Sequence, residues 1–188
     1  SKDRRSLIDI VDGTVEPGPS RTGNNIFENA FDGDLGSITF TTNGGTVASP
    51  QRTLLALENT SIHSLSRIRI NNVAGNDNNG RMERITVRVT TDSDKNLSAR
   101  DYFDVENLSV EMLSGDANPP PNVFINGNKI EHLDAEHDGF YSIVFDPVRG
   151  ATGIELEWAN EGQFKHWTIR EIEACTDAPN VQKNQPKI

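Results

Sequence analysis

Cysteine is nearly absent from this chain: Cys175 is the only one in 188 residues. A single thiol excludes an intrachain disulfide and any metal site built from several thiolates. Aromatic residues make up only 6% of the chain. No apolar run approaches the roughly 18 residues needed to cross a bilayer, and no segment keeps a helical apolar period for three turns. The sequence therefore argues against a disulfide-stapled domain, a transmembrane helix and a helical bundle.

Positive charge is also in short supply. The chain has 18 Lys and Arg against 28 Asp and Glu, a formal net charge of -10. This charge repels nucleic acid and anionic membrane surfaces, so we expect neither a nucleic-acid partner nor membrane insertion. The N-terminus has no apolar signal core, and the chain is therefore interpreted as a soluble segment excised from a longer protein.

The sequence does contain a series of short segments in which apolar and polar residues alternate. Each is bounded by Gly, Asn, Asp or Pro, which is typical of half-buried β-strands joined by polar turns. The expected strands lie at residues 53–57, 65–70, 85–89, 123–125, 141–145, 154–158 and 167–174. Many short strands of this kind predict an all-β domain, either an antiparallel sandwich or a barrel.

Polar segments divide the chain. Residues 71–80 and 114–122 are rich in Asn, Asp, Gly or Pro and are expected to be loops. Residues 1–24 are interpreted as an N-terminal extension or a first strand, and residues 25–176 as the sandwich itself. The polar, Pro-containing segment 177–188 is interpreted as a linker toward a further domain.

The segment 29–40 places Asp, Ser and Thr oxygens around glycines that let backbone carbonyls turn inward. Ca²⁺ takes about six to eight such oxygens. A distant carboxylate could complete the shell, and segment 167–174 carries Glu171 and Glu173 on a strand-like pattern. A metal joining the early loop to the last strand is therefore one hypothesis. An ordinary Asp-Gly surface turn is the alternative.

Three segments together resemble a known family. They are residues 29–34 (Asn-Ala-Phe-Asp-Gly-Asp) with Thr39 and Phe40, residues 80–89, and residues 167–173. Their order and separation resemble the discoidin or coagulation-factor C-type domains, which have a galactose-binding-like fold. Within that group the chain is most similar to the family 32 carbohydrate-binding modules.

The resemblance implies an antiparallel jelly-roll β-sandwich with a structural Ca²⁺ ion. It implies these ligands: Asp32 and Asp34 as loop carboxylates, Ser37 or Thr39 as a hydroxyl or carbonyl ligand, and Glu171 as the closing carboxylate, with Glu173 as the alternative. Glu171 shares parity with Trp167 and Ile169, so it would point to the same interior and need a compensating cation. A closed oxygen cage leaves no position for a substrate, so the ion is expected to stabilise the fold.

The chain departs from the family in three respects. Phe40 stands where Trp is common, residues 98–139 are longer and more acidic than in a compact member, and Cys175 alone cannot join the chain ends by a disulfide. The insertion leaves open which loops bind a ligand.

Sugar recognition needs an exposed aromatic plane and a few convergent polar side chains. Phe164 resembles in placement the stacking aromatic of the family 32 modules, and a core role is its alternative. Arg81 follows an Asn-rich loop and could bind hydroxyls or pair with a carboxylate. The other ligand-binding candidates, all at or near loops, are Asn76, Asn78, Asn79, His137 and Tyr141. Trp158 and Trp167 share parity with apolar neighbours, which places both in the core.

Two other segments are set aside. Residues 92–96 begin like a helix-loop-helix calcium site, but Leu97 and Phe103 occupy positions that need Gly and Glu, so a turn is expected. Residues 132–137 hold two histidines and two acids without a helix to present them together, so a solvated loop is expected. No nucleophile stands beside a base, which argues against an enzyme.

The leading hypothesis is a non-catalytic, lectin-like carbohydrate-binding module, extracellular or at the cell surface. It would tether a parent polysaccharide-active enzyme or adhesin to a glycan, with the C-terminal linker joining the module to that parent. The alternative is a protein-binding adhesion domain on the same fold, since a fold does not determine its ligand.

Overall fold

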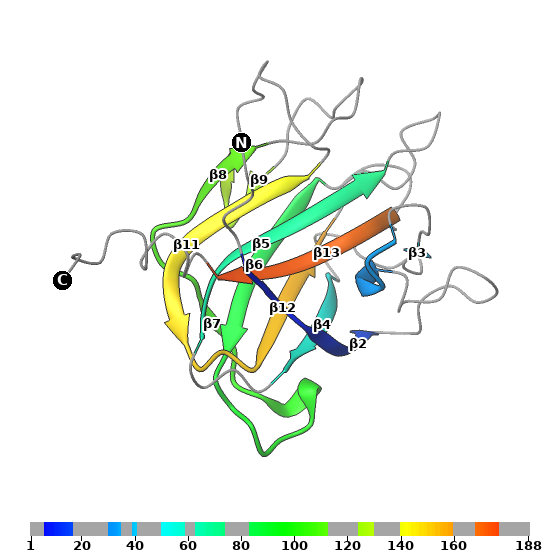
Figure 1. Ribbon diagram of the computed structural model, residues 1–188. Coiled ribbons are helices and arrows are strands. Elements are labelled where there is room, and N and C mark those ends of the chain that lie inside the picture. The colour runs from blue at the N-terminus through cyan, green and yellow to red at the C-terminus, as the bar shows by residue number, and fades with distance from the viewer. Residues whose placement is uncertain are drawn as a thin grey trace.

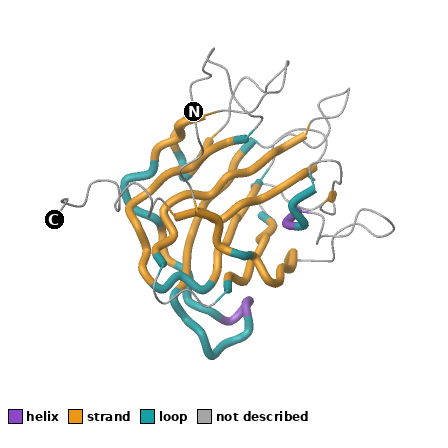
Figure 2. The backbone as a smooth tube through the Cα atoms, viewed as in Figure 1, coloured by secondary structure: helices purple, strands orange, loops and turns teal. Residues whose placement is uncertain are grey.

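The structure is a computed structural model that describes residues 6–16, 30–34, 39–40, 50–58, 63–73, 83–112, 124–129, 140–159 and 168–176. Within these residues the chain is mostly β-strand, with a short 3-10 helix, η2 (Leu97–Ala99), and 3-10 conformation also at residues 30–31 (Figures 1 and 2). The first seven strands are β1 (Ser6–Ile8), β2 (Ile10–Glu16), β3 (Thr39–Phe40), β4 (Gln51–Leu57), β5 (Ser64–Val73), β6 (Arg84–Thr90) and β7 (Phe103–Asp104). The others are β8 (Ser109–Met112), β9 (Phe124–Ile125), β10 (Asn128–Lys129), β11 (Tyr141–Arg149), β12 (Gly153–Trp158) and β13 (Thr168–Thr176).

The strands form two sheets. One has the order β1-β13-β5-β11-β8, with β3 also paired to β13, and is called the β5 sheet. The other has the order β10-β9-β6-β12-β4-β2, with β7 also paired to β6, and is called the β12 sheet. The pairing of β6 with β9 is parallel, and the remaining pairings between described strands are antiparallel. The expected all-β antiparallel sandwich is confirmed.

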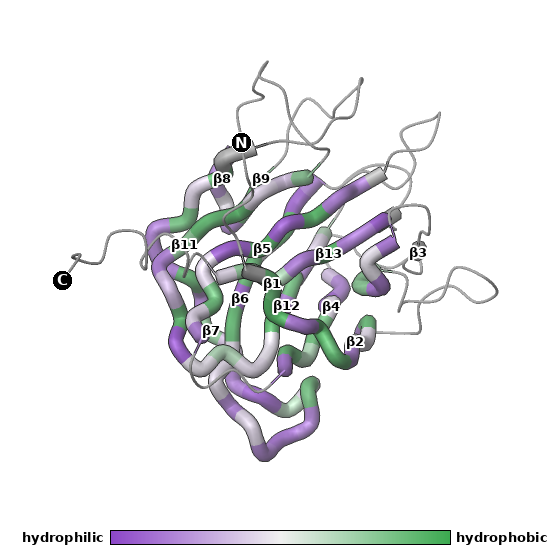
Figure 3. Tube along the Cα trace, in the orientation of Figure 1, coloured by the Kyte–Doolittle hydropathy of each residue, from purple (hydrophilic) through white to green (hydrophobic). Residues whose placement is uncertain are grey.

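The core lies between the two sheets. Alternate residues of the central strands point into it, including Ile68 and Ile70 from β5 and Ile154 and Leu156 from β12. Figure 3 shows apolar and polar residues alternating along these strands. Trp158 is 1% exposed within the same cluster, which confirms its expected core role. This alternation explains why a chain with few aromatic residues still buries a continuous apolar layer.

The seven strands expected from the alternating pattern are confirmed as β4, β5, β6, β9, β11, β12 and β13. Six further strands of the described structure escape the pattern. Five of them have two to four residues, which is too short to show a period. The sixth, β2, contains a register shift between Ile10 and Asp12 that interrupts the alternation.

Residues 6–16 complete both sheets. β1 lies at the edge of the β5 sheet beside β13, and β2 lies at the edge of the β12 sheet beside β4. The segment 1–24, interpreted above as an extension or a first strand, thus contains two edge strands in its described part. The segment after Thr176 and the residue Trp167 lie outside the described residues.

The described parts of the acidic region 98–139 contribute four strands to the sandwich, β7, β8, β9 and β10. β8 pairs with β11 at one edge of the β5 sheet, and β7 and β9 both pair with β6. The described parts of this region are therefore not an appended unit. No helix among the described residues is long and apolar enough to span a bilayer.

Candidate functional site

The loop at residues 30–34 meets the last strand, β13, next to the edge strand β1 of the β5 sheet. The Gly33 backbone N–H donates to both carboxylate oxygens of Glu171, at 3.2 and 3.1 Å. Gly33 has a φ of +79°, a conformation that favours glycine. The Asp34 N–H donates to Asp32 Oδ1 at 2.8 Å, which holds the loop in a tight turn. The two acidic segments singled out in the sequence are thus brought together.

Glu171 is a buried carboxylate with two other acids, Asp32 and Glu173, close enough to act on it. Its residue surface is 6% exposed. Burial raises the pKa of Glu171 from its ordinary 4.5 to about 7; the Gly33 hydrogen bond opposes this, while Asp32 and Glu173 add to it. No salt bridge to a basic side chain is present at Glu171 among the described residues. The site therefore holds more negative charge than its surroundings compensate.

Glu173, the alternative ligand, is in a different situation. Its carboxylate forms an ion pair with Arg69 Nη1 from the adjacent strand β5. The Arg69 guanidinium also lies over the Phe140 ring, 4.0 Å from its centroid. Because Glu173 already has a cationic partner, Glu171 is the better candidate for closing a metal shell.

The parity argument that placed Glu171 beside Ile169 in the interior is wrong. The register of β13 against β5 shifts between Ile169 and Glu171, so the alternation changes phase there. Ile169, Ile172 and Ala174 belong to the core cluster, so alternation back from Ile172 and Ala174 places Glu171 and Glu173 on the opposite face of β13. Glu171 is nevertheless buried, and the Gly33 N–H of the 30–34 loop donates to its carboxylate.

A pocket of about 270 Å³ lies where these segments meet. One part of its wall is apolar and the other is acidic. Its lining consists of residues 7–10 at the β1–β2 connection, residues 31–33 in the loop, and residues 171–174 of β13. The pocket therefore presents Asp32 and Glu171 to a common space.

Asp32 and Glu171 offer carboxylate oxygens, the ligand type that Ca²⁺ prefers. No group of three or more His, Cys, Asp and Glu side chains suited to a metal is found in the described parts of the chain. Ser37 lies outside the described residues, and Thr39 is described only as part of β3, paired with Ile169. The donor set present fits part of a hard-cation shell.

Of the predicted ligand-binding residues, Tyr141 alone lies in a described segment, and its prediction needs correction. It opens β11 opposite Ile70 and is 1% exposed within the core cluster. A side chain packed between the sheets has no surface to offer a ligand. The other candidates, Asn76, Asn78, Asn79, Arg81, His137 and Phe164, lie outside the described residues, as does segment 132–137.

The segment 92–96, expected to be a turn, belongs to a well-connected loop. Asp92 Oδ2 accepts a hydrogen bond from the Asp101 N–H at 2.6 Å, and Lys95 Nζ lies 3.5 Å from the same oxygen. The Arg100 side chain donates to the Thr152 carbonyl at 3.1 Å. These contacts close the loop, which bends at residues 94–95.

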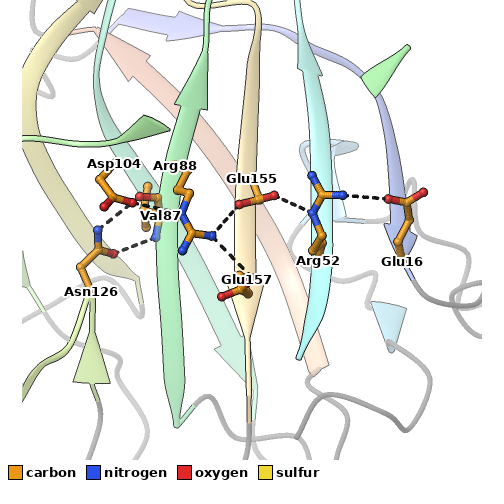
Figure 4. Close-up of polar contacts among 8 residues, drawn as sticks. All are labelled: Glu16, Arg52, Val87, Arg88, Asp104, Asn126, Glu155 and Glu157. Carbon is orange, nitrogen blue, oxygen red and sulfur yellow. Dashed lines mark hydrogen bonds and ion pairs between the residues drawn. The ribbon is translucent and has the colours of Figure 1, made fainter. Parts of the chain in front are cut away.

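Sequence reasoning missed a row of charged side chains on the outer face of the β12 sheet (Figure 4). Arg52 Nε donates to Glu155 Oε2 at 2.6 Å, and Arg88 Nη1 donates to Glu155 Oε1 at 2.7 Å. The members of this row, called here the Arg–Glu row, are Glu16, Arg52, Glu155, Glu157, Arg88 and Asp104. Alternation along each strand could have placed them outward, but not beside one another.

Comparison with known proteins identifies the architecture. No protein-family model and no curated protein sequence matches the chain. Among solved structures, a chitosan-binding module from a Paenibacillus chitosanase/glucanase aligns with a TM-score of 0.57 and 15% identity, over 89% of this chain and 96% of that one. A Clostridium perfringens family 32 module in complex with GalNAc-β-1,3-galactose gives a TM-score of 0.54 and 15% identity, over 91% and 94%. A pectin-binding carbohydrate-binding module aligns with a TM-score of 0.54 and 16% identity, over 89% of this chain and 91% of that one.

The chain has the fold of the family 32 carbohydrate-binding modules. At 15–16% identity the likeness concerns the backbone, so the side chains of the site have to be argued from their own geometry. In this family 32 fold, the described acidic pocket lies at the edge of the β5 sheet, whereas the Arg–Glu row lies on the outer face of the β12 sheet.

Proposed function

We propose that this chain is a non-catalytic carbohydrate-binding module that tethers a parent enzyme or adhesin to a glycan. The observation that supports this most is the fold, which is shared along nearly the whole length of modules described as binding chitosan, GalNAc-β-1,3-galactose and pectin. The sugar-contacting residues would be the loop residues singled out in the sequence, with Arg81 and Phe164 foremost.

The glycan proposal is tested by affinity electrophoresis and a glycan array with the isolated chain. A shallow loop site predicts a dissociation constant on the order of 0.1–1 mM for one site, with retention in the parent coming from effective concentration. Arg81→Ala and Phe164→Ala should weaken binding, and Arg149→Ala, on an exposed residue of β11, should not. Blank results on both assays, or binding to protein ligands alone, would refute the proposal.

A structural Ca²⁺ ion between the 30–34 loop and β13 is the second part of the proposal. It is supported by a buried carboxylate, Glu171, that lies beside Asp32 and has no salt bridge to a basic side chain in the described structure. Asp32 and Glu171 would bind the ion, together with oxygens from Asp34, Ser37 or Thr39. The ion would supply positive charge that lets both carboxylates stay ionised next to each other.

Chelation tests the metal. With Ca²⁺ at 100 times its dissociation constant, binding should add about 2.7 kcal/mol to the unfolding free energy, which corresponds to a rise in thermal midpoint of roughly 5–10 °C for a domain of this size. Asp32→Asn and Glu171→Gln should lose most of that response, whereas the exposed Asp94→Asn should keep it. A midpoint that does not differ between Ca²⁺ and chelator would end the metal proposal.

A further inference from the structure

The Arg–Glu row is organised around one buried carboxylate. The Glu155 side chain is 6% exposed, and each of its oxygens accepts a hydrogen bond from a different arginine. Although burial lowers the pKa of Arg88, its hydrogen bond to Glu155 and the charge of Glu157 raise it overall. Glu155 therefore fixes two charged guanidinium groups, Arg52 and Arg88, in position on either side of it (Figure 4).

Among the described residues, each of these arginines keeps one donor group without a partner. Arg52 bonds through Nε to Glu155 and through Nη1 to Glu16 at 3.3 Å. Arg88 bonds through Nε to Asp104 at 3.0 Å and through Nη1 to Glu155. Within the described part of the chain, Nη2 of either residue has no partner, and the two side chains are 30% and 28% exposed. Two preoriented pairs of N–H groups are thus available to an acceptor.

The row is long and has an aromatic side chain next to it. It crosses β2, β4, β12, β6 and β7, and five strands at about 4.8 Å spacing span about 19 Å, which suits a chain of sugars better than one sugar. The Tyr102 ring lies 5.8 Å from the Arg52 guanidinium carbon. The Tyr102 hydroxyl donates to the Leu97 carbonyl at 2.8 Å, so the half-buried ring is held in place beside the row.

The charges of the row select the class of ligand. Four carboxylates against two guanidiniums repel a polyanion, and the whole chain carries a net charge of -10. The unused groups are donors, so a ligand must offer acceptor atoms. Hydroxyl oxygens of a neutral glycan meet both conditions, and the apolar face of a pyranose can pack against an aromatic ring.

We propose that the Arg–Glu row is a second glycan-binding surface, on which a neutral polysaccharide chain lies across the outer face of the β12 sheet. This inference rests on the proposed carbohydrate-binding function, and it adds a site that is separate from the loops. A surface of this kind increases the affinity only for glycans that are long enough to extend along it.

The test compares neutral hexasaccharides with the matching monosaccharides, using β-1,4-linked glucose, mannose, galactose and xylose. Arg52→Lys and Arg88→Lys keep the charge but remove the Nη2 donors; each should weaken hexasaccharide binding roughly 3- to 10-fold, the range for a lost hydrogen bond. Monosaccharide binding should not change. Arg149→Lys, on an exposed residue of the other sheet, is the matched control. In the unmodified protein, the Nε–Hε NMR signals of Arg52 and Arg88 should shift when the hexasaccharide is added. This measurement does not depend on the folding of any variant.

The outcomes separate the two proposals. One outcome overturns the second surface alone. In it, all three lysine variants bind the hexasaccharide equally, both arginine signals stay unmoved, and Arg81→Ala abolishes binding. Shifts of the Arg52 and Arg88 signals by an acidic or an amino polysaccharide or by a peptide, but by no neutral glycan, also overturn it. Failure of the unmodified protein to bind any glycan refutes the proposed function and this surface together.

Discussion

At the scale of single residues, Glu171 combines burial with a lack of compensating positive charge. Its carboxylate is buried beside the 30–34 loop, and the Gly33 N–H donates to both of its oxygens. Asp32 and Glu173 face it, and Asp9 lines the same pocket. Such an arrangement destabilises the folded state when the Glu171 carboxylate is ionised, and this loss is removed when a proton or a cation is bound.

This gives a pH dependence with a definite sign. The unfolded chain releases the Glu171 proton near pH 4.5, whereas the folded chain holds it until about pH 7. In Ca²⁺-free buffer the contribution of Glu171 to stability is therefore fully present below pH 4.5 and is lost as pH rises through about 7. The thermal midpoint of Glu171→Gln should lack this fall, and that of the exposed Glu106→Gln should retain it. Parallel midpoint-against-pH curves for all three proteins would contradict the prediction.

At the scale of elements, β12 organises the second sheet. Its inward residues Ile154, Leu156 and Trp158 belong to the core, while its outward residues Glu155 and Glu157 join the Arg–Glu row. Because it pairs with both β4 and β6, one strand supports the core on one face and positions both arginines on the other.

Truncation within β12 should therefore be costly. Leu156→Ala removes a side chain with no exposed surface, and the lost burial plus the cavity should lower the unfolding free energy by about 2.7–5 kcal/mol. Val11→Ala on β2, where the side chain is 60% exposed, should change it by less than about 0.5 kcal/mol. Urea unfolding of both variants measures the difference, and equal losses would mean that β12 does not occupy the core as described.

At the scale of the whole molecule, net charge limits the range of ligands. A formal charge of -10 and a sequence pI near 4.8 oppose long-range attraction to any polyanion. The lone Cys175 is fully buried, so no exposed thiol is offered by the described surface.

The charge predicts a salt response that depends on the ligand. Raising ionic strength from about 0.01 M to about 1 M shortens the screening length from about 30 Å to about 3 Å. Binding of a neutral glycan should change little over that range, whereas any weak contact with a sulfated glycan should strengthen as repulsion is screened. Titration calorimetry at both salt concentrations tests this; sulfated-glycan binding that weakens with salt would show a basic site that the net charge conceals.

Much of this protein follows from local sequence. A period of two in short segments such as 85–89 and 154–158 is enough to specify strands, since it puts alternate side chains on one face. The same rule placed Trp158 in the core, and the glycine between Asp32 and Asp34 marked a tight acidic loop.

Tertiary structure decided the rest, because register and proximity depend on which strands pair. The shift in β13 after Ile169 removes Glu171 from the face that simple alternation assigns to it. Pairing of β11 with β5 sends Tyr141 into the core, away from any ligand. The Arg–Glu row exists only because β2, β4, β12, β6 and β7 lie side by side, and no spacing along the chain encodes that order.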